Sequence, residues 1–387
     1  MFYFFFFPEN EEVPESYKTR VRELGGKLIK QREGAPSFFG IKCSNRNFAK
    51  EKFWGKNQFN SSFPAALACY MRSKGLNAVY ISEQDKNTTG ISEISFDEVF
   101  GTSLPNEKLA FIFESAFAPY SELVTDSVEK IDLVIANAET MEHIRPLEIK
   151  LTALPDNTTA TLPNESDWGC EVVVRSPTIK YMVSSMAEAF KADRQSLRDI
   201  FEPACMHIKD WNNTIEMCHF RKGIFDVFSS FLCNHRELQK PLLMQPIWKT
   251  QKKKPVLKDH CLDIFVWSDF ALAQRVLDTV LYEPMDKMTI SRPQRAILRA
   301  ARFLYEFSLS GKVLQDKIFS EMQYSNQTDK EFALPGRVNN KYMRCDRLTK
   351  PAITKDEIKN IVLGGGQKWL SPERRFDAVL FFAKDLF

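Results

Sequence analysis

The sequence predicts an α/β protein in which a central sheet carries helices on both faces. Two runs of β-branched and apolar residues, 131–135 and 144–151, follow each other across a short polar turn and are predicted to pair as antiparallel strands. A third such run, 170–175, leads into a helical pattern that starts at Pro177 and continues to about residue 192. Strands followed by helices favour a layered sheet with helical cover.

Composition bounds the class of protein without identifying it. With 387 residues and 44% hydrophobic content, the chain can build a sizeable core, as two to three domains or as one enlarged α/β domain with an appended region. The net charge of +3 neither supports nor excludes a nucleic-acid partner, because a DNA enzyme needs basic surface only locally. No stretch reaches transmembrane length, and the N-terminal phenylalanine run is predicted to be a docked strand or a tail.

Eight cysteines are scattered without a Cys-x-x-Cys pair, which predicts no disulfide framework and fits a reducing cytoplasm. Four cysteines lie beside histidines, at Cys205/His207, Cys218/His219, Cys233/His235 and His260/Cys261. A zinc site is an alternative, but these spacings match no standard zinc pattern. Buried cysteines with incidental histidines are the preferred interpretation.

Three ionisable residues on the predicted hairpin form the main candidate site. Glu148 and Lys150 are two residues apart, so they point to the same face of their strand. If the register sets Asp132 across from them, two carboxylates and an ammonium meet within about 5 Å. Carboxylates that close require a cation, and Mg²⁺ typically takes one or two of them together with several waters. With a lysine to hold or deprotonate the attacking water, this is the Asp…Glu-x-Lys constellation of the PD-(D/E)xK nucleases.

The same pattern has a simpler alternative, a surface salt bridge on a hairpin, because Glu-x-Lys after an aspartate is common by chance. The chain contains a second copy at Glu357-Ile358-Lys359, where a capping-box pattern predicts a solvated helix. That copy is not a candidate.

Three stretches carry a resemblance that adds to this reading: 55–70 (GKNQFNSSFPAALACY), 147–159 (LEIKLTALPDNTT) and 170–181 (CEVVVRSPTIKY). They resemble the HindVP family of type II restriction endonucleases, from about Phe39 into the C-terminal region. The resemblance implies a PD-(D/E)xK core with a mixed central sheet flanked by helices. It also implies a Mg²⁺-dependent enzyme of the bacterial cytoplasm that cuts double-stranded DNA within a short palindrome of the GRCGYC type, alongside a partner methyltransferase. Cutting both strands of a palindrome suggests a homodimer.

Two further residues are candidates near this site. PD-(D/E)xK folds often supply an additional acidic residue from the helix before the first catalytic strand, and Glu114 lies in a predicted helix over 106–117. A partly exposed helix glutamate is the alternative. Arg175 follows the strand 170–175 and is assigned to a phosphate near the scissile bond, with a structural arginine as the alternative.

A polar loop before residue 62 is the candidate DNA-facing segment, with aromatic residues interleaved. Its candidates are Lys56, Asn57, Gln58 and Asn60. Asparagine and glutamine can pair bidentately with adenine, and lysine can contact guanine edges or phosphates. Without the resemblance, an ordinary polar loop is preferred.

The chain is predicted to divide into an N-terminal extension (1–37), a PD-(D/E)xK catalytic core (38–192) and a mostly helical C-terminal region (193–387) for DNA recognition or dimerisation. Other predicted elements are helices over 62–74, 96–100, 220–232, 270–281 and 293–309 and strands over 78–82 and 263–267. The rival functions are a repair or junction nuclease of the same superfamily, a non-enzymatic DNA-binding protein using its basic C-terminal loops, and a structural protein with a chance Asp…Glu-x-Lys.

Overall fold

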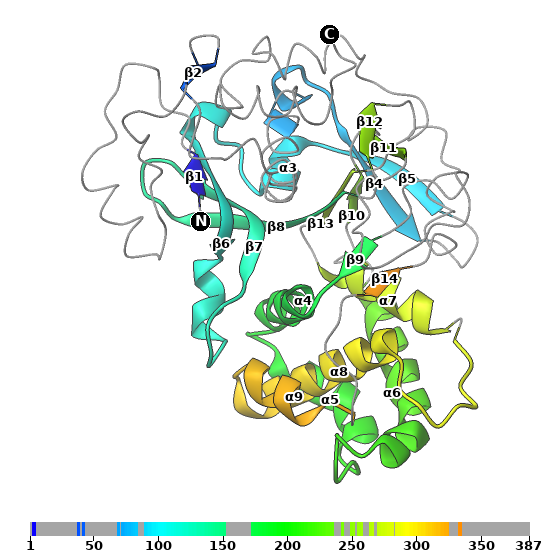
Figure 1. Cartoon of the computed structure of the whole chain (residues 1–387). Helices are drawn as coiled ribbons and strands as arrows, with labels where there is room; N and C mark the ends of the chain where they lie inside the picture. The colour runs from blue at the N-terminus through cyan, green and yellow to red at the C-terminus, as the bar shows by residue number, and fades with distance from the viewer. Residues whose placement is uncertain are drawn as a thin grey trace.

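The structure is a computed structural model of the chain, and an eight-stranded sheet resting on a group of helices organises it (Figure 1). It describes residues 2–4, 37–38, 41–42, 68–69, 71–83, 89–151, 172–235, 241–243, 248–251, 254–257, 263–266, 269–281, 283–324 and 332–334.

The strands of the large sheet lie in the order β1-β6-β7-β8-β13-β10-β4-β5. Their bounds, in that order, are Phe2–Phe4, Leu109–Ala116, Lys130–Asn137, His143–Leu151, Asp263–Val266, Pro241–Leu243, Ala78–Glu83 and Thr89–Ile94. All seven neighbouring pairs are antiparallel. The expected mixed sheet is therefore wrong for these strands. Strands β7 and β8 are joined by the short connection 138–142, which favours antiparallel neighbours, whereas β6 and β7 are joined by the longer segment 117–129 with the 3₁₀ turn η3 (Ala118–Glu122).

Within the described residues, three two-stranded pairs accompany this sheet. They are β2 (Ser37–Phe38) with β3 (Ile41–Lys42), β11 (Trp248–Gln251) with β12 (Lys254–Leu257), and β9 (Val172–Val174) with β14 (Phe332–Leu334). The last pair lies between the large sheet and the helices (Figure 1).

Strand β7 forms because it is apolar on both faces. Leu133 to Ala136 are fully buried, so the strand is covered from both sides. On one face, Ala110 of β6 and Val134 of β7 share a core with Tyr181 of helix α4 (Ser176–Ala189). On the other face, the ring of Phe100 from α3 (Phe96–Phe100) contacts Phe111 of β6 at 5.7 Å between centroids. This part of the sheet thus has helices on both faces, as predicted.

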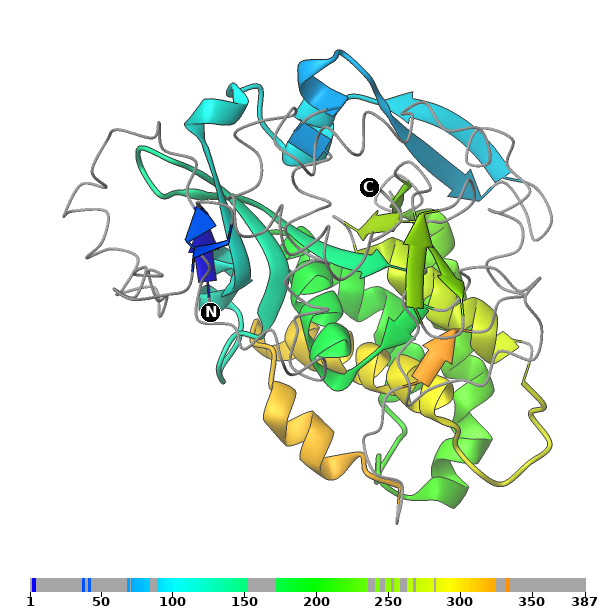
Figure 2. The same ribbon diagram turned by 45° about the horizontal axis from the view of Figure 1, so that its top comes forward.

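The helices gather below the sheet in Figure 1 and stay together when the view is turned in Figure 2. Besides α4 they are α5 (Arg194–Cys205), α6 (Thr214–Asn234), α7 (Asp269–Leu281), α8 (Arg292–Ser310) and α9 (Gln315–Glu321), whereas α3 lies on the other face of the sheet. Their shared core is apolar and rich in phenylalanine, including Phe201, Phe228 and Phe231. Strands β10 and β13 also come from this half of the chain, so it contributes both helices and two strands of the sheet.

Most predicted elements in the described residues are confirmed, namely strands β4, β7, β8, β9 and β13 and helices α3, α4, α6, α7 and α8. The helix predicted over 106–117 is wrong. A 3₁₀ turn, η2 (Asn106–Lys108), is followed by strand β6. The near-continuous apolar run from Leu109 to Phe113 fits both a helix face and a strand buried on two sides, so periodicity could not separate them.

The N-terminal phenylalanine run includes strand β1, which pairs antiparallel with β6 at the edge of the sheet. This confirms the docked strand among the two alternatives predicted for it. None of the helices in the described residues has the length and apolar character needed to cross a bilayer.

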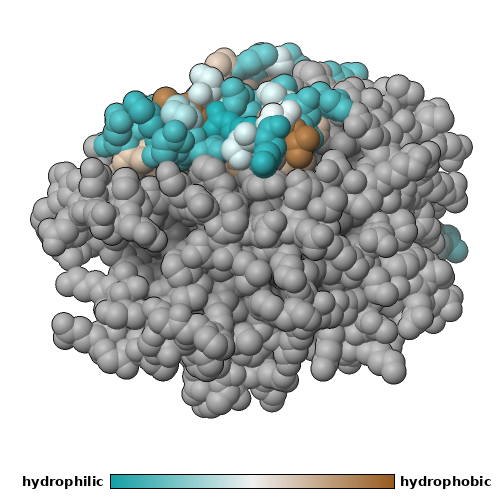
Figure 3. All heavy atoms as spheres, turned by 90° about the horizontal axis from the view of Figure 1, so that it is seen from above, coloured by the Kyte–Doolittle hydropathy of each residue, from teal (hydrophilic) through white to brown (hydrophobic). Residues whose placement is uncertain are grey.

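Seen from above, the described part of the surface is largely hydrophilic (Figure 3). An ion pair and a hydrogen bond of Arg72 lie near α3. Arg72 pairs with the exposed Asp97 at 2.6 Å and donates to Asn106 Oδ1 at 2.9 Å. These bonds fasten α3 and the turn before β6 to the short helical stretch that includes residues 71–73.

One buried arginine organises the loop between α7 and α8. Arg221 is 2% exposed and donates to the carbonyls of Lys287 and Thr289, each at 2.7 Å, and to that of Met285. It also donates to Gln294 Oε1 at 3.2 Å. Replacing a buried donor leaves buried acceptors unsatisfied, which costs more than the bond itself contributes.

We expect Arg221→Met to lower the free energy of unfolding by about 2–4 kcal/mol, because three carbonyls lose their donor. Urea denaturation of both proteins measures this. The matched control is Arg198→Met, which breaks a half-exposed i,i+4 ion pair with Glu202 within α5 and should change stability by less than about 1 kcal/mol. Equal effects of the two substitutions would contradict the prediction.

Candidate active site

Strand register brings two of the predicted carboxylates together. In the ladder between β7 and β8, Leu133 lies opposite Leu147 and Val134 opposite Pro146. Continuing that register by one residue sets Asp132 opposite Glu148. Directly opposed residues of an antiparallel pair lie on the same face of the sheet, with Cβ atoms roughly 4.5–5.5 Å apart. The juxtaposition predicted for Asp132 and Glu148 therefore agrees with the register.

The position of Glu148 is also where β8 changes partner. From Glu148 to Leu151, β8 pairs with β13, and Glu148 lies opposite Val266. Glu148 is thus held in the interior of the sheet, and its side chain is only 7% exposed. Lys150 follows two residues later, with Ile264 of β13 as its cross-strand partner.

Glu114 lies opposite Asp132 on the other neighbouring strand, β6. The ladder between β6 and β7 pairs Phe113 with Leu133 and Ser115 with Ile131, which sets Glu114 level with Asp132. It reaches this position from a strand and not from the helix that was predicted. The structure describes the backbone of Glu114 and Lys150 but not their side chains, so their roles remain predictions.

The first turn of α4 packs against Glu148. Thr178, which is 4% exposed, donates from Oγ1 to Glu148 Oε1 at 3.4 Å. The half-buried Arg175 is the N-cap residue of the same helix, directly after β9. Arg175 therefore lies three residues before Thr178 in the sequence, and its role at a phosphate remains a prediction. Sequence reasoning missed Thr178, because no spacing along the chain indicates which helix residue will meet a carboxylate of the sheet.

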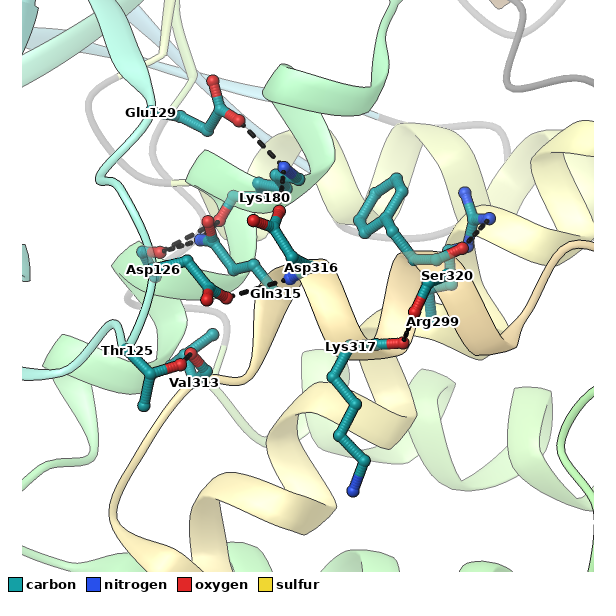
Figure 4. Close-up of polar contacts among 12 residues, drawn as sticks. Thr125, Asp126, Glu129, Lys180, Arg299, Val313, Gln315, Asp316, Lys317 and Ser320 are labelled. Carbon is teal, nitrogen blue, oxygen red and sulfur yellow. Dashed lines mark hydrogen bonds and ion pairs between the residues drawn. The ribbon is translucent and has the colours of Figure 1, made fainter.

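A second polar contact, formed by Lys180, connects α4 to the segment that leads into the strand bearing Asp132. Lys180 Nζ contacts Glu129 Oε1 at 3.0 Å and Asp316 Oδ1 at 2.9 Å, and its side chain lies between the two carboxylates in Figure 4. Glu129 immediately precedes β7, and Asp316 belongs to α9. Burial alone would lower the pKa of Lys180, but its hydrogen bonds to Asp316 and Glu129 raise that pKa above its ordinary value.

The segment before β7 is bound to the start of α9 by several further bonds (Figure 4). Val124 forms a parallel bridge with Val313, and the amide of Thr125 donates to the Val313 carbonyl at 3.2 Å. Asp126 Oδ2 accepts from the Asp316 amide at 3.0 Å, in the first turn of α9. Gln315 donates to the Lys180 carbonyl at 3.1 Å and to Ser184 Oγ at 2.8 Å, which closes the link back to α4.

The far end of the β7–β8 hairpin has a different electrostatic character. His143 Nδ1 accepts from the amide of Ala118 at 2.9 Å, and its ring stacks on Phe117. Burial lowers the pKa of His143 to about 4, so this imidazole is neutral at pH 7. Burial also lowers the pKa of Arg145.

The donor set fits a hard divalent cation. Mg²⁺ commonly takes one or two protein carboxylates and fills its remaining positions with water and phosphate oxygens. Asp132 and Glu148 supply two carboxylates from adjacent strands, and the burial of Glu148 favours a cation beside it. In the part of the chain that the structure describes, no group of three or more His, Cys, Asp or Glu side chains is arranged to hold a metal.

The candidate DNA-facing residues Lys56, Asn57, Gln58 and Asn60 lie outside the described residues, as does the second Glu-x-Lys at Glu357.

Comparison with known proteins identifies the family of the chain. The HindVP restriction endonuclease family matches residues 54–387. The type II restriction enzyme HgiDI of Herpetosiphon aurantiacus is 40% identical over 352 residues, covering 91% of this chain and 97% of that enzyme. The probable type II restriction enzyme HindVP of Haemophilus influenzae is 36% identical over 352 residues, covering 91% and 95%. No solved structure matches the chain.

These matches, together with the carboxylates on adjacent strands, place the protein among the restriction endonucleases. Within that class, the chain belongs to the HindVP restriction endonuclease family. The predicted resemblance is thereby confirmed over most of the chain.

We expect Lys180→Met to lower the free energy of unfolding by about 1–3 kcal/mol at pH 7, because two carboxylates lose a partly buried partner. The raised pKa means that this stabilisation is complete below the ordinary lysine pKa of 10.5 and disappears as pH rises through the folded-state pKa. Denaturation of both proteins at pH 7 and pH 11 tests this, and the difference between them should shrink at pH 11.

The control is Lys191→Met. Lys191 is exposed, lies just beyond the end of α4 and forms an ion pair with Glu188 in its last turn, so its replacement should not change stability measurably. A Lys180→Met protein as stable as the wild type at pH 7 would contradict the assigned role.

Proposed function

We propose that the protein is a type II restriction endonuclease that cleaves double-stranded DNA within a short palindrome by Mg²⁺-dependent hydrolysis at Asp132, Glu148 and Lys150. The observation that carries this proposal is the strand register, which sets Asp132 level with Glu148 while Lys150 follows on the same strand. The interpretation of these three residues as a nuclease site is supported by membership of the HindVP family and by the names of the two relatives.

The proposed chemistry divides among the residues of the β7–β8 pair. Asp132 and Glu148 would hold the cation, and Glu114 is level with them as a third acidic group. Mg²⁺, when bound, supplies Lewis-acid stabilisation of the charge that develops on the phosphate oxygens. Lys150 orients the attacking water and accepts its proton, and Arg175 holds a phosphate near the scissile bond.

The remaining parts of the proposal concern recognition and assembly. One active site cuts one strand, so cleavage of a palindrome is best served by a homodimer whose two-fold axis coincides with that of the DNA. Lys56, Asn57, Gln58 and Asn60 are the proposed contacts to DNA, and a GRCGYC-type site is the proposed sequence. A cognate methyltransferase would protect the host DNA in the bacterial cytoplasm.

We expect Asp132→Asn, Glu148→Gln and Lys150→Met each to reduce cleavage by roughly 10²-fold or more, because each removes a group that acts on the reacting phosphate. Gel shifts in the presence of EDTA should show DNA binding close to that of the wild type. Cleavage is measured on unmethylated phage DNA with Mg²⁺. Glu139→Gln is the matched control, since Glu139 is an exposed carboxylate in the turn of the same hairpin and should retain full activity.

The pattern of products tests the class of nuclease. Discrete bands that disappear with EDTA support the proposal, and mapping their ends gives the recognition site. A smear would indicate a non-specific or repair nuclease. DNA that is shifted but never cut would favour a binding protein, and a fully active Asp132→Asn enzyme would remove Asp132 from the site.

A further inference from the structure

We propose that Thr178 is a positioning residue of the metal site, whose hydroxyl fixes the orientation of the Glu148 carboxylate. The inference rests on the proposed function, in which Glu148 holds the cation. A carboxylate has two oxygens, and Thr178 engages Oε1 at 3.4 Å, so its hydrogen bond selects the rotation of the whole group. A carboxylate that is already oriented loses less conformational freedom when a cation binds.

The contact is built from two buried side chains. Thr178 is 4% exposed and Glu148 is 7% exposed, so water competes poorly for this bond. The hydroxyl can supply a proton to a carboxylate oxygen, and hydrogen bonds to an ionised acceptor are stronger than neutral ones. Threonine in a helix can instead bond back to a carbonyl of the preceding turn. Here the hydroxyl reaches across to the sheet.

Thr178 is presented from a helix that is itself fixed on both sides of the site. It lies in the first turn of α4, after Pro177, where the fixed φ of proline favours helix initiation. Two residues later, Lys180 binds Glu129 at the entry to β7. Helix α4 therefore contacts the carboxylate of β8 through Thr178 and the approach to β7 through Lys180. A rigid support of this kind is what keeps metal ligands in their productive geometry.

The test is a titration of Mn²⁺ by calorimetry into wild-type protein and three variants at position 178, without DNA. We expect Thr178→Val and Thr178→Ala to weaken Mn²⁺ binding by about 10-fold or more, the scale on which supporting residues act on metal ligands. Thr178→Ser keeps the hydroxyl and should bind close to wild type. Thr279→Val is the matched control, because Thr279 is also 4% exposed but donates to the Arg275 carbonyl within α7.

A second readout separates positioning from a general loss of structure. The Mg²⁺ concentration that gives half-maximal cleavage should rise by a similar factor in Thr178→Val, while the rate at saturating Mg²⁺ changes much less. Thermal unfolding of each variant confirms that it is folded, and Thr178→Ala provides the comparison if valine is not accommodated.

The outcomes distinguish this inference from the function on which it rests. If Glu148→Gln loses Mn²⁺ binding but Thr178→Val and Thr178→Ala bind like the wild type, Thr178 does not position the ligand and the proposed function stands. If Thr178→Ser loses as much affinity as Thr178→Val, the hydroxyl is not the active group and the inference is overturned. If Glu148→Gln itself binds Mn²⁺ normally, the metal site of the proposed function fails.

Discussion

The register of three consecutive antiparallel strands is the constraint on which the candidate site depends. Because opposed residues share a face, a shift of one residue in either ladder would carry Asp132 to the opposite face from Glu148 and Glu114. The register is held by apolar neighbours on both faces of β7. A slip would expose residues that are fully buried, or would bring them into steric clash with the neighbouring core. Packing in the sheet therefore decides which carboxylates meet.

Helix α4 adds a second constraint, because it packs against the face of the sheet that Glu148 shares. The sheet sets the residues of β7 and β8 level with one another, whereas α4 fixes side chains on the face they share. Thr178 meets Glu148 there, and Lys180 secures the approach to Asp132. The same lysine also binds Asp316 of α9, so the helical half of the chain helps to hold the segment that leads into β7. The helices support the site as well as enclosing a core.

The sequence predicted what depends on local pattern. The alternation in β8 and the polar turn before it were sufficient for the hairpin, and Pro177 marked the start of α4. Glu114 shows the limit, because its apolar surroundings suited a helix as well as a strand covered on both faces. The pairing of β8 with β13, more than a hundred residues away, and the contact of Thr178 with Glu148 depend on tertiary packing, which no spacing along the chain encodes. The mixed sheet was an expectation from resemblance alone, and the antiparallel ladders replace it.

Burial explains why a cation suits this site better than a salt bridge within the hairpin. A surface ion pair needs no support, because water screens both charges and the pair contributes little. Glu148 is instead almost wholly buried between two strands and a helix, where an ionised carboxylate is costly unless an opposite charge or strong donors accompany it. Thr178 supplies one such donor. In the proposed function, a divalent cation held by Asp132 and Glu148 would supply balancing positive charge, which is why two carboxylates on adjacent strands favour Mg²⁺.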